Sequence, residues 1–330
     1  MPANSDASTS LTTYIDAIRQ ALEEEMERDE SIICIGEDIG GFGGAFKATK
    51  GLLQRYGEER VIDFPIAETA LIAMATGAAM YGLRPVVEIQ FADFVTNGFN
   101  QIVTNAARVH YRYGQSVPLV IRLPSGGGLG AGPFHSINPE AWFFHCPGLK
   151  LVAPATANDA RGLLKAAIRD NNPVLFFEHK YLYRRVKETL EPGDGACEIG
   201  HAAIRRAGSD LTIVTYGVTL GMCLEAADVV AQDGIDVEII DLRTLLPWDR
   251  QLVLGSVRKT ARALVVHEAT RTGGIGAEIA ATIGEAAFQH LLVRRLCSHD
   301  TPVPFAPTLE EFFRPSTAKV VDEIRALATY

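Results

Sequence analysis

Glu68 is a carboxylate at the head of an apolar stretch of the sequence. From position 68 to position 82, the phenol of Tyr81 is the only other ionisable group. Residues 69–80 are apolar or small on every face, which predicts a buried helix with Glu68 in its first turn. There the carboxylate can complement the helix dipole, or it can share a proton with a basic nitrogen of a bound ligand, because ionised glutamates are rarely buried without a partner. The residues alone leave both roles open.

A glycine-rich segment precedes His135, the second side chain whose position suggests chemistry. Residues 126–132 contain five glycines in seven positions after a predicted strand. A dinucleotide-binding turn needs GxGxxG that opens directly into a helix, with an acidic residue further on. Gly126 and Gly128 give only GxGxxA, and Pro133 intervenes. We expect the glycines to let the backbone approach a bulky ligand or bend sharply to aim His135, and the alternative is a flexible surface loop.

The elements that must position these residues alternate between strands and helices along the chain. This alternation is typical of α/β architecture with mostly parallel sheets flanked by helices. The predicted strands are 31–38, 84–94, 118–124, 149–155, 173–179, 210–217, 235–242, 263–270 and 294–300. The predicted helices begin after Glu68 and cover 98–113, 156–170, 220–234 and 273–290.

The alternation breaks once, in a segment at 187–200 that is rich in Gly, Glu and Pro. A chain of 330 residues is also longer than one hydrophobic core usually grows. We therefore predict two domains, with these divisions: a flexible leader at 1–10, a first domain at 11–190, a linker at 191–200 and a second domain at 201–330.

The composition excludes several classes of function. The formal net charge of -9 and the absence of basic clusters argue against a nucleic-acid partner. No apolar run is long enough to span a membrane, and positions 1–10 lack the features of a signal peptide, so we expect a cytoplasmic protein. The five cysteines include no CxxC pair, which argues against a disulfide framework or a structural zinc site. The P-loop, GxSxG and HExxH motifs are all missing from the sequence.

Several long segments match one known family in order. The strings VIDFPIAETALIAMATGAAMYGLRPVVEIQFADF and HSINPEAWFFHCPGLKLVAP, followed by NPVLFFEHKYLYR, IDLRTLLPWD and HDTPVPFAPTLEEFF, resemble the β chain of the thiamin-diphosphate-dependent decarboxylase component of 2-oxo acid dehydrogenase complexes. The resemblance implies a pyrimidine-binding domain followed by a transketolase-like C-terminal domain. It also implies that this chain, with an α subunit, decarboxylates a 2-oxo acid and transfers the acyl group to a lipoyl domain.

The resemblance implies an assembly of two α and two β chains, with magnesium and the diphosphate held by the α subunit, and a lipoyl-bearing acyltransferase core as a further partner. In thiamin diphosphate enzymes, a magnesium motif begins with GDG and ends in paired asparagines further along the chain. Here GDG stands at 193–195, whereas the paired asparagines at 171–172 precede it. The match is therefore accidental, and a separate α chain accounts for the missing motif.

The resemblance also implies roles for particular residues. Glu68 matches the glutamate that hydrogen-bonds the aminopyrimidine ring and, by sharing a proton, favours its imino tautomer. His135 matches an active-site histidine placed for substrate or for the incoming lipoyl group, and Phe94 matches an aromatic position beside the pyrimidine. For both, a residue that merely packs in the core is the alternative. Further matched positions are Ile66 and Gln90 in the cofactor lining, and Asp170 and Asn172 where the family often holds potassium.

The substrate stays open on the sequence alone. Family members usually have Thr where this chain has Phe64 and Gln where it has Ile137, so the pocket near His135 differs from the usual pattern. A branched-chain 2-oxo acid or pyruvate is expected, with an acetoin-cleaving enzyme as an alternative. A non-catalytic assembly subunit and a stand-alone transketolase-like enzyme are the other readings. We also expect a subunit contact at Ala73 and Gly77, which share one face of their helix.

Overall fold

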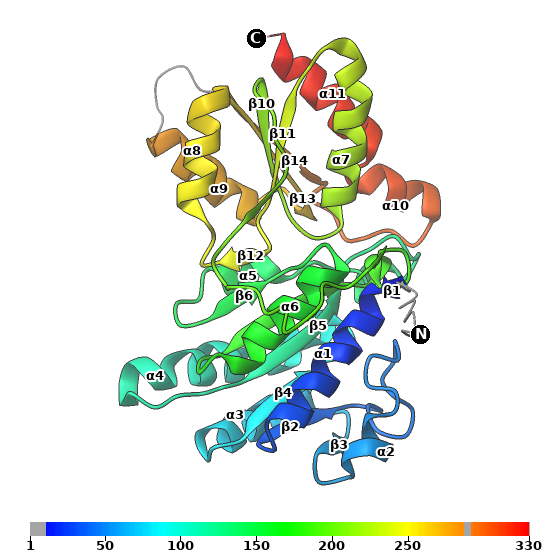
Figure 1. The fold of residues 1–330 in the computed structure, drawn as a ribbon, viewed down its shortest axis with the longest axis vertical. Coiled ribbons are helices and arrows are strands. Elements are labelled where there is room, and N and C mark those ends of the chain that lie inside the picture. The colour runs from blue at the N-terminus through cyan, green and yellow to red at the C-terminus, as the bar shows by residue number, and fades with distance from the viewer. Residues whose placement is uncertain (1–10, 287–291, 330) are drawn as a thin grey trace, which may run out of the picture.

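The computed structural model describes residues 11–286 and 292–329 (Figure 1). The predicted leader at 1–10 and the last residues of the helix predicted at 273–290 lie outside that part of the chain. Two sheets lie one above the other in Figure 1, each with helices on its two faces. The predicted α/β class with mostly parallel sheets is confirmed. Within the described ranges, none of the helices has the length and apolar character that crossing a membrane requires.

The first sheet has seven strands in the order β12-β6-β7-β5-β4-β2-β3. Its strands are β2 (Ile32–Gly36), β3 (Val61–Asp63), β4 (Arg84–Glu88), β5 (Val120–Ser125), β6 (Lys150–Val152), β7 (Val174–His179) and β12 (Thr244–Leu246). All neighbouring pairs are parallel except β12 with β6. Because helices cover both faces, β2, β5 and β7 are buried at every position, as their apolar runs predict.

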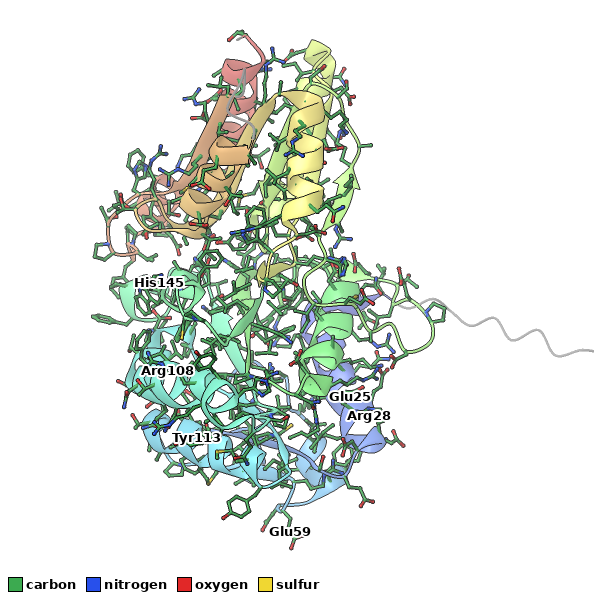
Figure 2. All side chains as sticks on the ribbon, turned by 90° about the vertical axis from the view of Figure 1, so that its left-hand side faces the viewer. Glu25, Arg28, Glu59, Arg108, Tyr113 and His145 are labelled. Carbon is green, nitrogen blue, oxygen red and sulfur yellow. The ribbon has the colours of Figure 1, made fainter. Side chains whose placement is uncertain are left out.

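Different helices cover the two faces of the first sheet. On one face α1 (Tyr14–Arg28) packs beside α6 (Ala157–Arg169), and their apolar side chains share a core with β2 and β7. Glu25 is fully buried between these helices and pairs with Arg28 and Arg169; Figure 2 labels Glu25 and Arg28 on α1. On the other face lie α3 (Glu68–Met80), the 3-10 helix η1 (Ala92–Gly98), the π-helix η2 (Gln101–Ala106) and α4 (Ala107–Tyr113). Shorter helices are α2 (Leu52–Tyr56) and α5 (Glu140–Phe144).

The second sheet has five strands in the order β14-β13-β10-β11-β9. They are β9 (Ala203–Arg206), β10 (Leu211–Thr215), β11 (Val237–Asp241), β13 (Arg262–Thr270) and β14 (Leu292–Ser298), and only the β9–β11 pair is antiparallel. One face is covered by α7 (Thr219–Val230) and α11 (Thr317–Ala328), and the other by α8 (Arg250–Thr260) and α9 (Ile275–Ala286). The remaining helix, α10 (Pro307–Phe313), precedes α11.

The chain crosses back to the first sheet after the predicted linker. Strand β12 lies in the segment predicted as the second domain, yet it pairs with β6 at the edge of the first sheet. A two-stranded sheet of β1 (Thr12–Thr13) and β8 (Lys187–Glu188) ties the beginning of the first domain to its end. The two domains are therefore joined by a strand as well as by the linker.

Helix α3 is buried on one face only in this single chain. Leu71, Ile72 and Ala75 are fully buried against the sheet, whereas Met74 is 41% exposed. A Cβ added at Gly77 would meet nothing within 4 Å. The expectation of a helix buried on every face is therefore wrong for the isolated chain, because its own domain covers only half of the apolar circumference.

Candidate active site

Most of the predicted site residues gather at the carboxyl ends of the strands of the first sheet. Ile66 and Glu68 follow β3, Gln90 and Phe94 follow β4, and His135 follows β5. Ligands of open α/β sheets bind at this edge, because loops from neighbouring parallel strands converge there. Residues far apart in the sequence are thereby placed at the same edge of the sheet.

Glu68 is the first residue of α3 and is only 7% exposed. Asn97 Nδ2 donates a hydrogen bond to Glu68 Oε2 at 3.3 Å. This contact depends on the close packing of η1 against α3, since a Cβ at Gly98 would lie 2.2 Å from the side chain of Ile72. Burial, and then the nearby charge of Glu68, raise the pKa of the Glu37 carboxyl. The site therefore combines a buried glutamate that has one long hydrogen bond with a second carboxyl that gains a proton readily.

His135 lies between two aromatic rings of the segment that follows β4. The ring centroids of Phe91 and His135 are 4.6 Å apart at an interplanar angle of 85°, and those of Phe94 and His135 are 5.5 Å apart at 82°. Ile66 is 83% exposed, although it lies only two residues before the buried Glu68. Phe94 and His135 are thus brought together, and the apolar wall at Ile66 is open to solvent in the single chain.

Asp93 is a site residue that the sequence reasoning missed. Its Oδ1 accepts hydrogen bonds from the backbone N–H groups of Ser136 and Ile137, at 3.2 and 3.3 Å. The side chain is 8% exposed, and burial raises its pKa although the charge of Lys180 opposes the rise. An acidic residue between Phe91 and Phe94 in an apolar string was the available signal, because such a carboxylate needs donors when it is buried.

The glycines before His135 admit side chains of both β7 and the second domain. A Cβ at Gly126 would lie 1.9 Å from His179 Nε2, and one at Gly132 would lie 2.2 Å from the ring of Phe305. The backbone N–H groups of Gly128 and Gly130 donate to Glu310 at 2.7 and 3.1 Å. In this single chain the close approach that the sequence predicted is made by the end of β7 and by the protein's own C-terminal domain, which fix the loop that carries His135.

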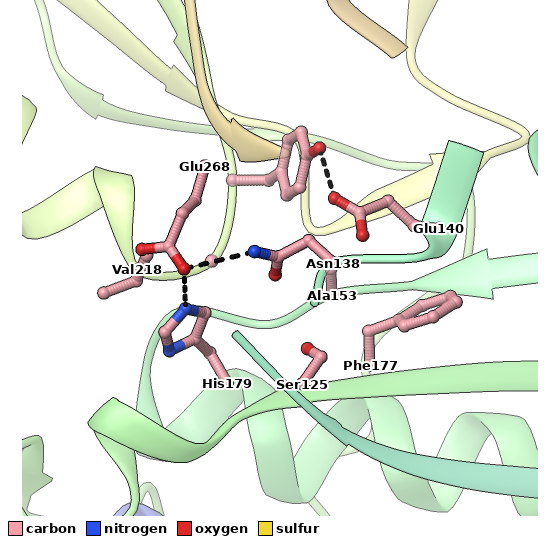
Figure 3. A pocket seen from close by; sticks show the side chains of 10 residues that line it. Ser125, Asn138, Glu140, Ala153, Phe177, His179, Val218 and Glu268 are labelled. Atoms are coloured by element: carbon pink, nitrogen blue, oxygen red, sulfur yellow. Dashed lines mark hydrogen bonds and ion pairs between the residues drawn. The ribbon is translucent and has the colours of Figure 1, made fainter. Parts of the chain in front are cut away.

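A buried polar network joins the two domains behind this loop (Figure 3). Glu268 Oε1 accepts from Gly127 N at 2.8 Å and from Asn138 Nδ2 at 3.1 Å, and it lies 2.9 Å from His179 Nε2. Burial alone would raise the pKa of Glu268, but the charges of His179 and Arg314 hold it below its usual range. The cavity beside these groups measures about 20 Å³, room for about one water molecule. The network thus serves as a rigid support for the loop.

Asp170 and Asn172 lie at the opposite edge of the sheet, before β7 and next to the start of β6. Lys150 Nζ donates to Asp170 Oδ2, and the backbone N–H of Asn172 donates to Asp170 Oδ1 at 2.9 Å. Arg84 also donates to the Asp170 carbonyl at 2.7 Å. Both carboxylate oxygens of Asp170 therefore have protein donors, and the pair is remote from His135.

Comparisons with known proteins agree with this geometry. Residues 11–186 match the model of the transketolase pyrimidine binding domain, and residues 200–320 match that of the transketolase C-terminal domain. The chain is 46% identical over 326 residues to the 2-oxoisovalerate dehydrogenase subunit beta of Bacillus subtilis (strain 168), covering 97% of this chain and 100% of that protein. It is 41% identical to the pyruvate dehydrogenase E1 component subunit beta of Rhizobium meliloti (strain 1021), over 99% of this chain and 72% of the relative.

A solved structure shows the same fold. The split gene transketolase described as an inactive beta4 tetramer superposes with a TM-score of 0.81, covering 97% of this chain and 99% of the other. At 24% sequence identity, this likeness supports the fold alone.

Proposed function

This chain belongs to the transketolase-like family of β subunits of 2-oxo acid dehydrogenases, and from that premise we propose that its Glu68 and His135 form half of an active site shared with an α subunit. The shared enzyme decarboxylates a 2-oxo acid on thiamin diphosphate and passes the acyl group to a lipoyl domain of an acyltransferase core. One observation carries the proposal: a buried carboxylate and an imidazole packed against aromatic rings lie at the same edge of the first sheet, where Ile66 is 83% exposed. A second chain that covers Ile66 would complete such a site.

The side chains fit one end of the cofactor. Glu68 has a single described donor, Asn97 at 3.3 Å, so its carboxyl group is able to bond a ring nitrogen. Ile66, Gln90 and Phe94 supply a partly apolar lining for a flat heteroaromatic ring. When bound, thiamin diphosphate supplies the electron sink that loss of carbon dioxide requires.

The protein's own contribution is proton transfer and orientation. Glu68 would share a proton with a ring nitrogen of the bound cofactor, a kind of assistance worth about 10²- to 10⁴-fold in rate. His135 would donate a proton to the sulfur that is released when a lipoyl disulfide opens. Phe91 and Phe94 fix the plane of the imidazole and exclude water from two of its sides.

The diphosphate and its magnesium belong to the α subunit in this proposal, because the GDG-to-asparagine motif is missing here. Two α and two β chains form the assembly. Potassium at Asp170 and Asn172 is outside the proposal, because Lys150 and the backbone N–H of Asn172 already occupy the Asp170 carboxylate and the residues present do not fit a cation.

A branched-chain 2-oxo acid is the proposed substrate and pyruvate the second candidate, in the order of identity of the relatives named for each. The two unusual residues lie near the site. The N–H of Phe64 donates to the Gly36 carbonyl at 2.9 Å, at the carboxyl end of β2, and Ile137 follows the His135 loop and donates to Asp93. Both replace polar residues of the usual pattern with apolar ones, which favours an apolar acyl group.

The test is reconstitution with an α chain of a 2-oxo acid dehydrogenase. Binding of labelled thiamin diphosphate, decarboxylation of 2-oxoisovalerate and of pyruvate, and cleavage of acetoin are measured for each chain alone and for the mixture. We expect binding and turnover in the mixture only, with 2-oxoisovalerate preferred. Turnover by this chain alone contradicts the shared site, cleavage of acetoin alone identifies the acetoin enzyme, and tight assembly without any turnover identifies a non-catalytic subunit.

A further inference from the structure

The turn after β4 contacts the His135 segment on three sides. Phe91 and Phe94 place their rings against the imidazole, and Asp93, between them in sequence, binds the next two backbone N–H groups. Within the same turn, the hydroxyl of Thr96 donates to the Asp93 carbonyl at 3.1 Å. One short stretch thus holds both the side chain and the backbone of the segment that carries the imidazole.

Asp93 and Lys180 are both buried and carry opposite charges. Asp93 Oδ2 is buried and has no hydrogen-bond partner among the described residues. Lys180 follows β7, is 4% exposed, and donates to the Pro124 carbonyl at 3.3 Å. Its ammonium lies 5.7 Å from the ring centroid of Phe91. Burial lowers the Lys180 pKa to about 8, and the charges of Asp93 and Glu268 oppose that fall.

We propose that Asp93 is the positioning residue of His135, holding the backbone at 136 and 137, and that the buried ammonium of Lys180 is its counter-charge. A buried carboxylate that binds two N–H groups orders a loop strongly, because charged acceptors make the stronger hydrogen bonds. The orientation of the imidazole depends on that order. A displacement of about 1 Å at a reacting group costs about 10²-fold in rate, so a loosened loop should slow the reaction.

The first experiment is independent of catalysis. Hydrogen exchange of the segment around 133–138 is compared in the whole chain for Asp93→Ala, for Asp93→Asn, which keeps an oxygen acceptor, and for Thr96→Val, a control in the same turn. We expect exchange at the amides of Ser136 and Ile137 to rise at least about 10-fold in Asp93→Ala and by less in Asp93→Asn, with Thr96→Val near wild type. Unchanged exchange in Asp93→Ala overturns the proposal.

The counter-charge has its own test. Lys180→Met leaves the Asp93 carboxylate buried without a positive charge, so we expect a lower melting temperature. Adding Asp93→Asn should recover part of that loss, because the remaining charge is removed while the acceptor oxygen stays. If the melting temperature of the double variant falls by the sum of the two single decreases, Asp93 and Lys180 are not paired.

A kinetic cycle links the geometry to the imidazole, and this part rests on the proposed function. With the α chain present, acyl transfer to a lipoyl domain is measured for Asp93→Ala, His135→Ala and the double variant. We expect Asp93→Ala to slow transfer by about 10-fold or more, and to add little once His135 is absent. If the two single losses in transfer rate multiply in the double variant, Asp93 does not act through His135. If the mixture lacks all turnover, the proposed function is refuted, and the exchange experiment alone decides this inference.

Discussion

Tyr216 donates its hydroxyl hydrogen to Glu140 Oε1 at 2.7 Å, across the boundary between the two domains. Tyr216 follows β10 of the second sheet, and Glu140 begins α5 of the first domain. Both side chains are buried, at 7% and 3% exposed. The docking of the domains therefore encloses a carboxyl group that accepts a hydrogen bond from a side chain of the other domain.

Stability should depend on pH through Glu140. Burial raises its pKa to about 7, although the hydrogen bond from Tyr216 opposes the rise. In the unfolded chain a glutamate titrates near about 4.3. Between these two pH values the folded state binds more protons than the unfolded state. The stabilisation of the folded state by Glu140 is therefore complete below about pH 4.3 and is lost as the pH rises through about 7.

Glu140→Gln tests this dependence, because glutamine accepts the same hydrogen bond and cannot ionise. The free energy of unfolding of the variant and of wild type is measured with guanidinium at pH 5 and at pH 8. The value for the variant minus the value for wild type should be about 1 to 3 kcal/mol larger at pH 8 than at pH 5. If the variant and wild type differ in free energy of unfolding by the same amount at both pH values, Glu140 is not a buried group that titrates between them.

The close approach of the glycine loop to the end of β7 can be measured with two matched glycines. Gly126 and Gly193 have the same backbone angle, φ +83, but only the first would place a Cβ against His179. Each alanine costs about 1 to 2 kcal/mol for the left-handed backbone. Gly126→Ala should lower the free energy of unfolding by about 1 to 3 kcal/mol more than Gly193→Ala, because a packed neighbour must move. Equal losses show that the fold does not need this contact between the loop and His179.

Gly77 tests whether α3 is a subunit contact. Since a Cβ there meets nothing within 4 Å in its own chain, Gly77→Leu should leave the fold intact and disrupt the assembly with the α chain. Gly255→Leu, on α8 at a position that is equally open, is the control. Light scattering reports the assembly and circular dichroism the fold. A normal assembly of Gly77→Leu removes this face from the interface.

His135 should separate the two half-reactions. His135→Ala is expected to keep a substantial part of its decarboxylation rate with an artificial electron acceptor, while transfer to a lipoyl domain falls by about 10²-fold or more, the scale of a lost general acid. Phe134→Ala, at the 66% exposed neighbouring position, is the control. Equal losses in both assays assign His135 to substrate binding or to the shape of the site, and equal retention makes it a packing residue.

The sequence predicted the parts of the site that depend on local pattern. Glu68 at the start of its helix and the strand that precedes His135 follow from apolar runs and turn residues, and the strand at 173–179 agrees closely with β7. The strand predicted at 84–94 is too long, because β4 ends at Glu88 and Phe94 lies in η1. The resemblance supplied the roles, which no pattern of spacing provides. These roles stay predictions until the variants are measured.

The other features of the site and the fold cannot be predicted from local pattern, because they depend on contacts between segments that are distant in the sequence. Glu268 and Glu310 bind the glycine loop from 141 and 182 residues away, and nothing near them in sequence indicates that loop. Strand β12 joins the first sheet although it follows a strand of the second. The position of Asp93 in an apolar string indicates a buried carboxylate, but not which backbone groups donate to it.

Glu68→Gln tests whether Glu68 shares a proton with the cofactor. Glutamine keeps the size of the side chain and an acceptor for Asn97, but it cannot share the proton. The decarboxylation rate is measured on the reconstituted assembly at saturating thiamin diphosphate and magnesium, with Asn97→Ala as the control. We expect Glu68→Gln to lose at least about 10²-fold in rate with assembly intact, and Asn97→Ala to lose less than about 10-fold. An unchanged rate in Glu68→Gln contradicts the account and leaves Glu68 as a carboxylate that complements its helix dipole.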